Sequence, residues 1–82
     1  MLKNLGVEPL GRQLTVEYLS NIFKKKFKNI KSALLDQNII AGIGNIYASE
    51  ILYKAGINPY RTVDSLSEQN LISIIKAIKF IL

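Results

Sequence analysis

The residues that could do chemistry gather at a glycine-rich turn formed by Gly42, Ile43, Gly44 and Asn45. Two glycines ahead of a predicted helix let the backbone turn sharply and come close to a ligand. The first amides of that helix then point outward as an anion site. Asn45 adds a side-chain donor there, so a phosphate oxygen could be held by backbone amides, a side-chain amide and the positive helix end together. This spacing predicts a phosphate site.

Each of these features also has a plain structural interpretation. Glycines before a helix are common turn residues, and Asn45 could simply cap the helix. The lysine segment, residues 24–28, could be a solvated face that complements a helix dipole. Tyr47 shares its predicted helix with other large apolar residues, which favours packing over base stacking. Spacing alone leaves both interpretations open.

The carboxylates indicate structure rather than catalysis. Glu50 has no companion carboxylate nearby in the sequence, and its i,i+4 spacing from Lys54 predicts a surface pair. Asp36 is expected either to cap a helix or to accept hydrogen bonds from the turn that follows it. The chain contains no Cys and no His, which excludes a thiolate zinc site, a cysteine nucleophile and the usual general base. We expect no catalytic residue, no metal and no cofactor in this chain.

Length and charge limit the class of protein. The 82 residues allow one domain, and 11 Lys and Arg against 6 Asp and Glu give a net charge of +5, which suggests a polyanionic partner. Residues 1–6 lack the apolar region of a signal peptide. The apolar stretch 71–82 is shorter than the roughly 20 residues of a membrane span, so a core helix is favoured. We expect an intracellular, cytoplasmic protein with no membrane partner.

The first half of the chain predicts an irregular leader and two helices. Residues 1–14 form the leader, expected to come from a preceding domain, and its apolar residues Leu5, Val7 and Leu10 are available to pack. Thr15 is the expected N-cap of a helix that carries Phe27 on its apolar side and the lysine segment in its last turn. A short helix over 30–36 follows, with Asn29 as its N-cap.

The second half predicts two longer helices. One runs from Asn45 to residue 54 or 55, with Gly56 as its C-cap. The other begins at a capping box of Ser65 with Glu68 and runs to the end. This last helix is apolar on more than one side and has no stop signal, so the chain looks truncated at its C-terminal end. The fold class is therefore all-α, with about four helices in a small orthogonal bundle over residues 15–82.

Four ordered blocks resemble one known family. These are residues 5–10, 30–37, 42–50 and 55–59, which match the helix-two-turn-helix domain of the formamidopyrimidine-DNA glycosylase family over nearly all of residues 5–82. The related endonuclease VIII group shares the domain. The Gly-x-Glu-Pro-Leu start and the intact Gly-Ile-Gly-Asn-Ile-Tyr block favour the formamidopyrimidine group.

The resemblance implies an activity. The family removes oxidised purines, such as 8-oxoguanine and formamidopyrimidines, from duplex DNA and then cleaves the abasic strand. Its members attack through an N-terminal proline amine, form a Schiff base, use an adjacent glutamate as acid, and flip the lesion nucleotide into a pocket. The helix-two-turn-helix domain and a C-terminal zinc ribbon grip the backbone around the lesion.

The resemblance also assigns residues. The family's phosphate-binding Asn corresponds to Asn45, and a basic DNA contact corresponds best to Lys26, with Lys25 as the alternative. Lys31 matches a lysine of the motif whose role stays open. The backbone amides of residues 42–45 are implied partners for phosphate. The candidate DNA-binding residues are Lys25, Lys26, Lys31, Gly42, Gly44, Asn45 and Tyr47.

The departures from the family pattern concern catalysis. The chain begins Met-Leu-Lys rather than Pro-Glu, and without Cys it has no zinc ribbon. We expect this segment to bind damaged double-stranded DNA weakly and to catalyse nothing. Its implied partners are an N-terminal catalytic domain and a zinc ribbon, both outside the segment, in a nucleoid-associated protein. Two alternatives stay open: a non-catalytic RNA- or DNA-binding helical module, and a structural docking domain.

Overall fold

The computed structural model describes residues 6–82. Leu5, which the sequence indicated as available to pack, lies outside the described residues. Most of residues 1–6, which were expected not to be a signal peptide, lie outside them as well. The described elements are α1 (Val16–Phe23), α2 (Ile30–Leu35), α3 (Asn45–Ala55), the 3-10 helix η1 (Val63–Ser65) and α4 (Glu68–Ile81). The predicted all-α class with about four helices is confirmed.

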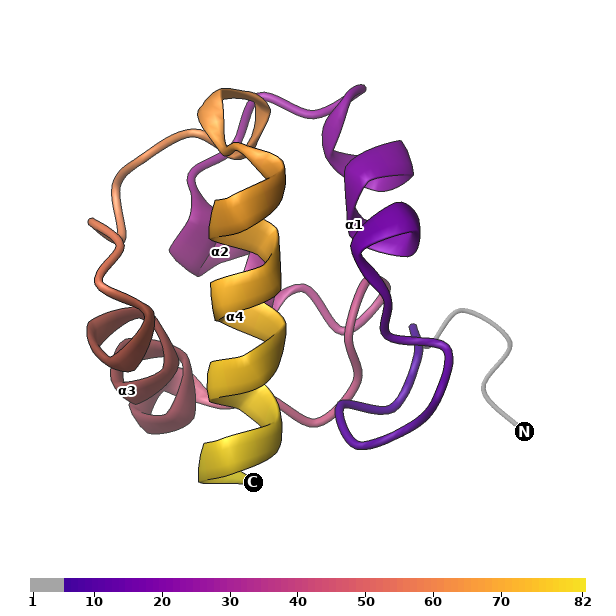
Figure 1. Ribbon diagram of the computed structural model, residues 1–82, viewed down its shortest axis with the longest axis vertical. Helices are drawn as coiled ribbons and strands as arrows, with labels where there is room; N and C mark the ends of the chain where they lie inside the picture. Colours follow the sequence, from indigo (N-terminus) through magenta and orange to yellow (C-terminus); the bar gives the residue numbers. More distant parts are fainter. Residues whose placement is uncertain (1–5) are drawn as a thin grey trace.

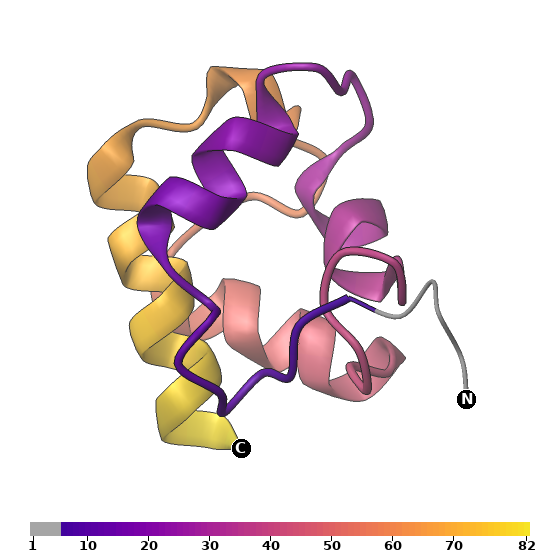
Figure 2. The ribbon, with the colours of Figure 1, turned by 90° about the vertical axis from the view of Figure 1, so that its right-hand side faces the viewer.

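Helix α4 is the central element of the fold. It packs against α1 on one side and α3 on the other, and α3 also packs against α2. Figure 1 shows α4 in front, and α3 runs across it in Figure 2, as the expected orthogonal bundle requires. The α4 residues Leu71, Ile74, Ala77 and Ile78 are buried. Burial on two sides explains why this helix is apolar beyond one stripe.

The core among the described residues is wholly apolar. It is formed by Leu14, Leu19, Phe23, Ile30, Ala33, Leu34, Ile39, Ile40, Ile43, Ala48, Ile51, Leu52, Ile57, Val63, Leu71, Ile74, Ala77 and Ile78. The segment that leads into α3 contributes Ile39, Ile40 and Ile43. The glycine turn (residues 42–45) is therefore anchored at its start by core residues.

Three of the predicted helix caps are confirmed. Thr15 Oγ1 accepts a hydrogen bond from the Tyr18 amide, and Asn29 Oδ1 accepts one from the Ser32 amide. Gly56 ends α3 in the left-handed region at φ 73°, where a residue without Cβ is favoured. These caps depend on local backbone geometry, which explains why their residue types revealed them.

The predicted fourth cap is wrong by two residues. Ser67, not Ser65, caps α4: its hydroxyl accepts from the Asn70 amide, and Asn70 Oδ1 accepts from the Ser67 amide. Ser65 instead ends η1, where its hydroxyl donates to the Thr62 carbonyl at 2.6 Å. Because buried Val63 holds this short helix against the core, α4 begins after it.

The predicted position of the lysine segment, in the last turn of the first helix, is also wrong. Helix α1 ends at Phe23, and Phe27, expected on its apolar face, is 81% exposed. The chain leaves the helix because its backbone pairs with another segment. The Lys28 carbonyl accepts from the Val63 amide, and Asn29 forms an antiparallel bridge with Thr62.

The described part of the leader pairs with the segment that precedes the glycine turn. Val7 and Ile40 form a parallel bridge, and Gly6 donates to the Gln37 carbonyl at 2.7 Å. Of the leader residues expected to be available to pack, Val7 is half-buried against the core, whereas Leu10 is 60% exposed and does not pack against it. Within residues 6–82, no helix is both long and apolar enough to cross a membrane.

Candidate nucleic-acid interface

The glycine turn leaves the start of α3 uncapped. Gly44 is the N-cap, with extended backbone and no side chain to satisfy the first amides. The first helical hydrogen bond runs from the Ala48 amide to the Gly44 carbonyl at 2.9 Å. The amides of Asn45, Ile46 and Tyr47 precede it and have no carbonyl partner within the helix. These donors lie at the positive end of an 11-residue helix, an arrangement that suits an anion.

Asn45 is the first residue of α3 rather than its cap, so the cap alternative is wrong. Its side chain is exposed and, within the described part of the chain, makes no hydrogen bond. Space around the turn is open, because a Cβ added at Gly42 or Gly44 would meet nothing within 4 Å. The side-chain amide of Asn45 therefore lies beside the open amides with its donors available to a ligand.

Gln37 is a residue of the site that sequence reasoning missed. Its side-chain oxygen accepts from the Gly42 amide at 2.7 Å. Its side-chain nitrogen donates to the carbonyls of Leu35 and Ile43 at 3.2 and 3.3 Å. The sequence signal was an amide side chain five residues before a glycine, between a helix end and a turn, which is too common to stand out.

Asp36, at the end of α2, carries the one ion pair of residues 6–82. Its Oδ1 accepts from the Asn38 amide at 2.9 Å, and its Oδ2 pairs with Lys28 Nζ at 3.0 Å. The Asn38 hydrogen bond, and after it Lys28, hold the pKa of Asp36 below its ordinary value, and the charge of Lys26 acts in the same direction. Both roles left open for Asp36 are observed: it is the C-cap residue of α2, and its side chain accepts from the turn that follows.

The structure places the three remaining candidates, all lysines, before α2 or in its first turn. Lys25 is exposed and Lys26 half-buried in the turn after α1, and Lys31 is half-buried in the first turn of α2. Figure 2 shows the lysine segment above α2 and the glycine turn below it. A ligand that touches both must therefore span α2, whose 6 residues make about 9 Å.

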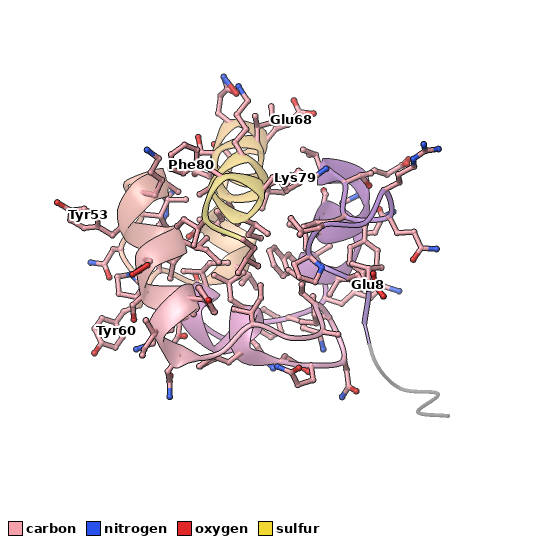
Figure 3. The ribbon with its side chains drawn as sticks, turned by 90° about the horizontal axis from the view of Figure 1, so that it is seen from below. Glu8, Tyr53, Tyr60, Glu68, Lys79 and Phe80 are labelled. Carbon is pink, nitrogen blue, oxygen red and sulfur yellow. The ribbon has the colours of Figure 1, made fainter. Side chains whose placement is uncertain are left out.

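Two predictions for α3 need correction. Tyr47, predicted to pack, is 45% exposed, and its neighbour Ile46 is 75% exposed. The predicted Glu50–Lys54 pair does not form. Lys54 Nζ lies 4.2 Å from the centre of the Phe80 ring instead, because α3 and α4 pack side by side and bring the ring within reach. Figure 3 shows Phe80 on α4 beside α3, with Tyr53 and Tyr60 pointing outward.

The described residues offer little to other chemistry. Across 6–82, no three His, Cys, Asp or Glu side chains are placed to hold a metal ion. One groove of about 670 Å³ lies between α1 and the start of α4, lined by residues such as Ser20, Lys24 and Glu68. The glycine turn contributes nothing to this groove. The glycine turn is an open surface, suited to an extended ligand rather than to a small molecule.

The fold and the uncapped helix start define a helix-two-turn-helix domain. The structure superposes with a TM-score of 0.89 on the MutM (Fpg) protein of Thermus thermophilus, at 35% identity over 95% of this chain and 29% of that one. It superposes with a TM-score of 0.88 on Lactococcus lactis Fpg in complex with DNA containing an abasic site, at 33% identity over 96% and 29%.

Sequence comparison gives the family. The sequence model of the formamidopyrimidine-DNA glycosylase H2TH domain matches residues 5–82. The formamidopyrimidine-DNA glycosylase of Carboxydothermus hydrogenoformans is 52% identical over 81 residues, which is 99% of this chain and 31% of that protein. The chain belongs to the formamidopyrimidine-DNA glycosylase family, within its H2TH domain. It spans less than a third of the length of each of these three relatives.

Proposed function

We propose that this chain is the DNA-gripping domain of a DNA glycosylase and AP lyase that acts on oxidised purines such as 8-oxoguanine and formamidopyrimidine. The observation that carries the proposal is the start of α3, where open amides and the exposed Asn45 side chain lie together at a positive helix end. Family membership supports a phosphate of duplex DNA beside the lesion as that anion.

Each candidate residue receives a role in this proposal. Asn45, the open amides at the start of α3 and the backbone of Gly44 hold a phosphate that flanks the lesion, with Tyr47 at the edge of the contact. The Gly42 amide already donates to the Gln37 side-chain oxygen, so Gly42 shapes the turn rather than donating to the phosphate. On the other side of α2, the strand is contacted by three cations: Lys25, Lys26 and Lys31. Phosphate contacts of this kind position a protein on DNA without reading its sequence.

The ion pair of Asp36 supports phosphate binding nearby. A carboxylate one residue before Gln37 would repel a phosphate at the glycine turn if it were unpaired. Lys28 lies 3.0 Å away and offsets that charge. The net charge of +5 favours approach to DNA over a longer range, an effect that salt weakens.

Catalysis is proposed to lie outside these 82 residues. The family's nucleophile, acid and zinc ribbon correspond to no residue of this chain, so its proposed partners include the catalytic domain and the ribbon as well as damaged DNA. We propose a cytoplasmic, nucleoid-associated location, since the DNA substrate lies there. The purified segment is expected to leave an 8-oxoguanine duplex intact, and strand cleavage by the segment would contradict this.

The test is fluorescence anisotropy of a labelled duplex that carries a stable abasic-site analogue, titrated with the chain at two salt concentrations. Salt-sensitive binding is the expected result, since each neutralised phosphate releases counterions. A circular-dichroism melt of the same sample establishes that the chain is folded. A folded chain without affinity at low salt, or with a clear preference for structured RNA, would refute the proposal.

A further inference from the structure

We infer that Gln37 is a positioning residue, which holds the glycine turn in the shape that presents Asn45 and the open amides to a phosphate. The inference rests on the proposed function and deepens it. Gln37 lies in the segment between α2 and α3 and is itself exposed. Its side chain touches the turn rather than the proposed ligand.

The hydrogen bonds of the Gln37 side chain use both of its polar atoms. The oxygen accepts from the Gly42 amide, and the nitrogen donates to the carbonyls of Leu35 and Ile43. Its contacts thus join the last residue of α2 to the two residues that begin the turn. An amide side chain suits this arrangement because it offers an acceptor and two donors on one planar group.

The core holds Ile43, but the two glycines on either side of it have no side chains to restrain them. Gly42 has φ +87°, in the left-handed region, and a Cβ added at Gly42 or Gly44 would meet no neighbouring atom. Glycine retains more conformational freedom than other residues, so an unsupported turn would sample several shapes. The conformational entropy lost on ordering the turn would then weaken ligand binding. A turn that is already held in its binding shape avoids this cost.

Hydrogen bonds at Gln37 and at its neighbours on both sides hold its backbone in place. Its carbonyl accepts from the Gly6 amide at 2.7 Å, which ties it to the leader. The residue before it, Asp36, bonds the Asn38 amide and Lys28. Two residues on, the Ile39 carbonyl accepts from the Tyr18 hydroxyl of α1. The side-chain amide of Gln37 therefore extends toward the turn from an anchored backbone.

The first test replaces Gln37 by methionine, which keeps its length and removes its polar atoms. The matched control is Gln69→Met, at an exposed position of α4. We expect Gln37→Met to bind the abasic-site duplex about 3- to 10-fold more weakly, because the side-chain hydrogen bonds that hold the turn are lost. Gln69→Met should bind as the unchanged chain does. Faster hydrogen exchange of the Gly42 amide should accompany the loss, with melting still well above the assay temperature.

A double-mutant cycle separates positioning from a direct contact. Where Asn45 is already alanine, Gln37→Met should weaken binding by a clearly smaller factor, because one of the donors that the turn presents is gone and only the open amides remain. Equal weakening with and without Asn45 would overturn the inference, as would unchanged affinity in Gln37→Met. If the unchanged chain fails to bind DNA, the proposed function fails. Unchanged exchange at Gly42 in Gln37→Met would then still refute the hydrogen-bond role.

Discussion

Replacing Gly6 by alanine tests how closely the leader lies against the segment that leads to the glycine turn. A Cβ at Gly6 would lie 2.2 Å from both the carbonyl carbon and the oxygen of Ile39, and 2.7 Å from the Ile40 nitrogen. These are backbone atoms, so no side-chain rotation can relieve the overlap. Gly6 has no positive φ, and the penalty therefore comes from close approach alone.

The size of the destabilisation follows from the contacts that break when the leader moves away from this segment. Three backbone hydrogen bonds connect the leader to this segment: Gly6 to Gln37 at 2.7 Å, Val7 to Ile39 at 3.2 Å and Ala41 to Val7 at 2.9 Å. At about 0.5–1.5 kcal/mol each, their loss is about 1.5–4.5 kcal/mol, and overpacking without separation costs about 1–3 kcal/mol. We expect the free energy of unfolding to fall by about 2–3 kcal/mol.

The assay is thermal unfolding followed by circular dichroism, with Gly11→Ala as the matched control. At Gly11 the nearest atoms to an added Cβ are Glu8 O at 3.4 Å and Glu8 Cβ at 3.5 Å, which is ordinary contact. For a domain of this size, about 2–3 kcal/mol corresponds to a fall in Tm of roughly 10–20 °C. Gly11→Ala should change stability by at most about 1 kcal/mol. Equal melting of the two variants would refute the close approach at Gly6.

Three further predictions concern charge and phosphate binding. Asn45→Ala should weaken duplex binding by about 1–2 kcal/mol through a lost charge-assisted hydrogen bond, measured by anisotropy. Lys25→Ala combined with Lys26→Ala should make the plot of log binding constant against log salt concentration less steep, by the slope of up to about two phosphate contacts. Asp36→Asn should be less stable than the unchanged chain near neutral pH. Because the folded-state pKa of Asp36 is lowered, its contribution is present above the unfolded value near 3.8 and is lost as the pH falls below it.

Controls decide each of these predictions. Asn45→Ala should have the same Tm as the unchanged chain, since the Asn45 side chain makes no hydrogen bond that supports the described fold. If its affinity for DNA were also the same, Asn45 would not be part of the interface. For the lysine pair, the comparison is Lys76→Ala with Lys79→Ala, two exposed cations of α4. If both double variants had the same salt dependence, Lys25 and Lys26 would be solvated surface residues that do not contact DNA. A stability difference between Asp36→Asn and the unchanged chain that persists unchanged from about pH 5 to about pH 3 would refute the role of that carboxylate.

Local features explain what could be predicted about the fold. Thr15, Asn29 and Gly56 were identified as caps because each acts within a few residues of itself, through a side-chain oxygen or a left-handed backbone. The glycine turn and the start of α3 were found for the same reason. Asn45 was located at the start of the helix, although only the structure shows that it is the first helical residue rather than the cap.

Contacts between distant segments explain the errors. The end of α1 and the position of Phe27 depend on pairing with Val63, 35 positions beyond Lys28. The choice of Ser67 over Ser65 depends on the burial of Val63. Lys54 lies over Phe80 rather than beside Glu50 because α3 packs on α4. The periodicity of apolar residues along the chain does not predict contacts between segments so far apart in sequence.

The sequence by itself determined the helical class, three of the helix caps, the charge and the position of the glycine turn at residues 42–45. These follow from residue types and short spacings, which set the local backbone. The tertiary structure alone decided that α2 separates the lysine segment from the glycine turn, and that Lys28 neutralises Asp36. It also decided that Gln37 reaches Gly42. Such contacts form only when the core brings separate segments together, because a side chain's partner is set by packing as well as by its position in the chain.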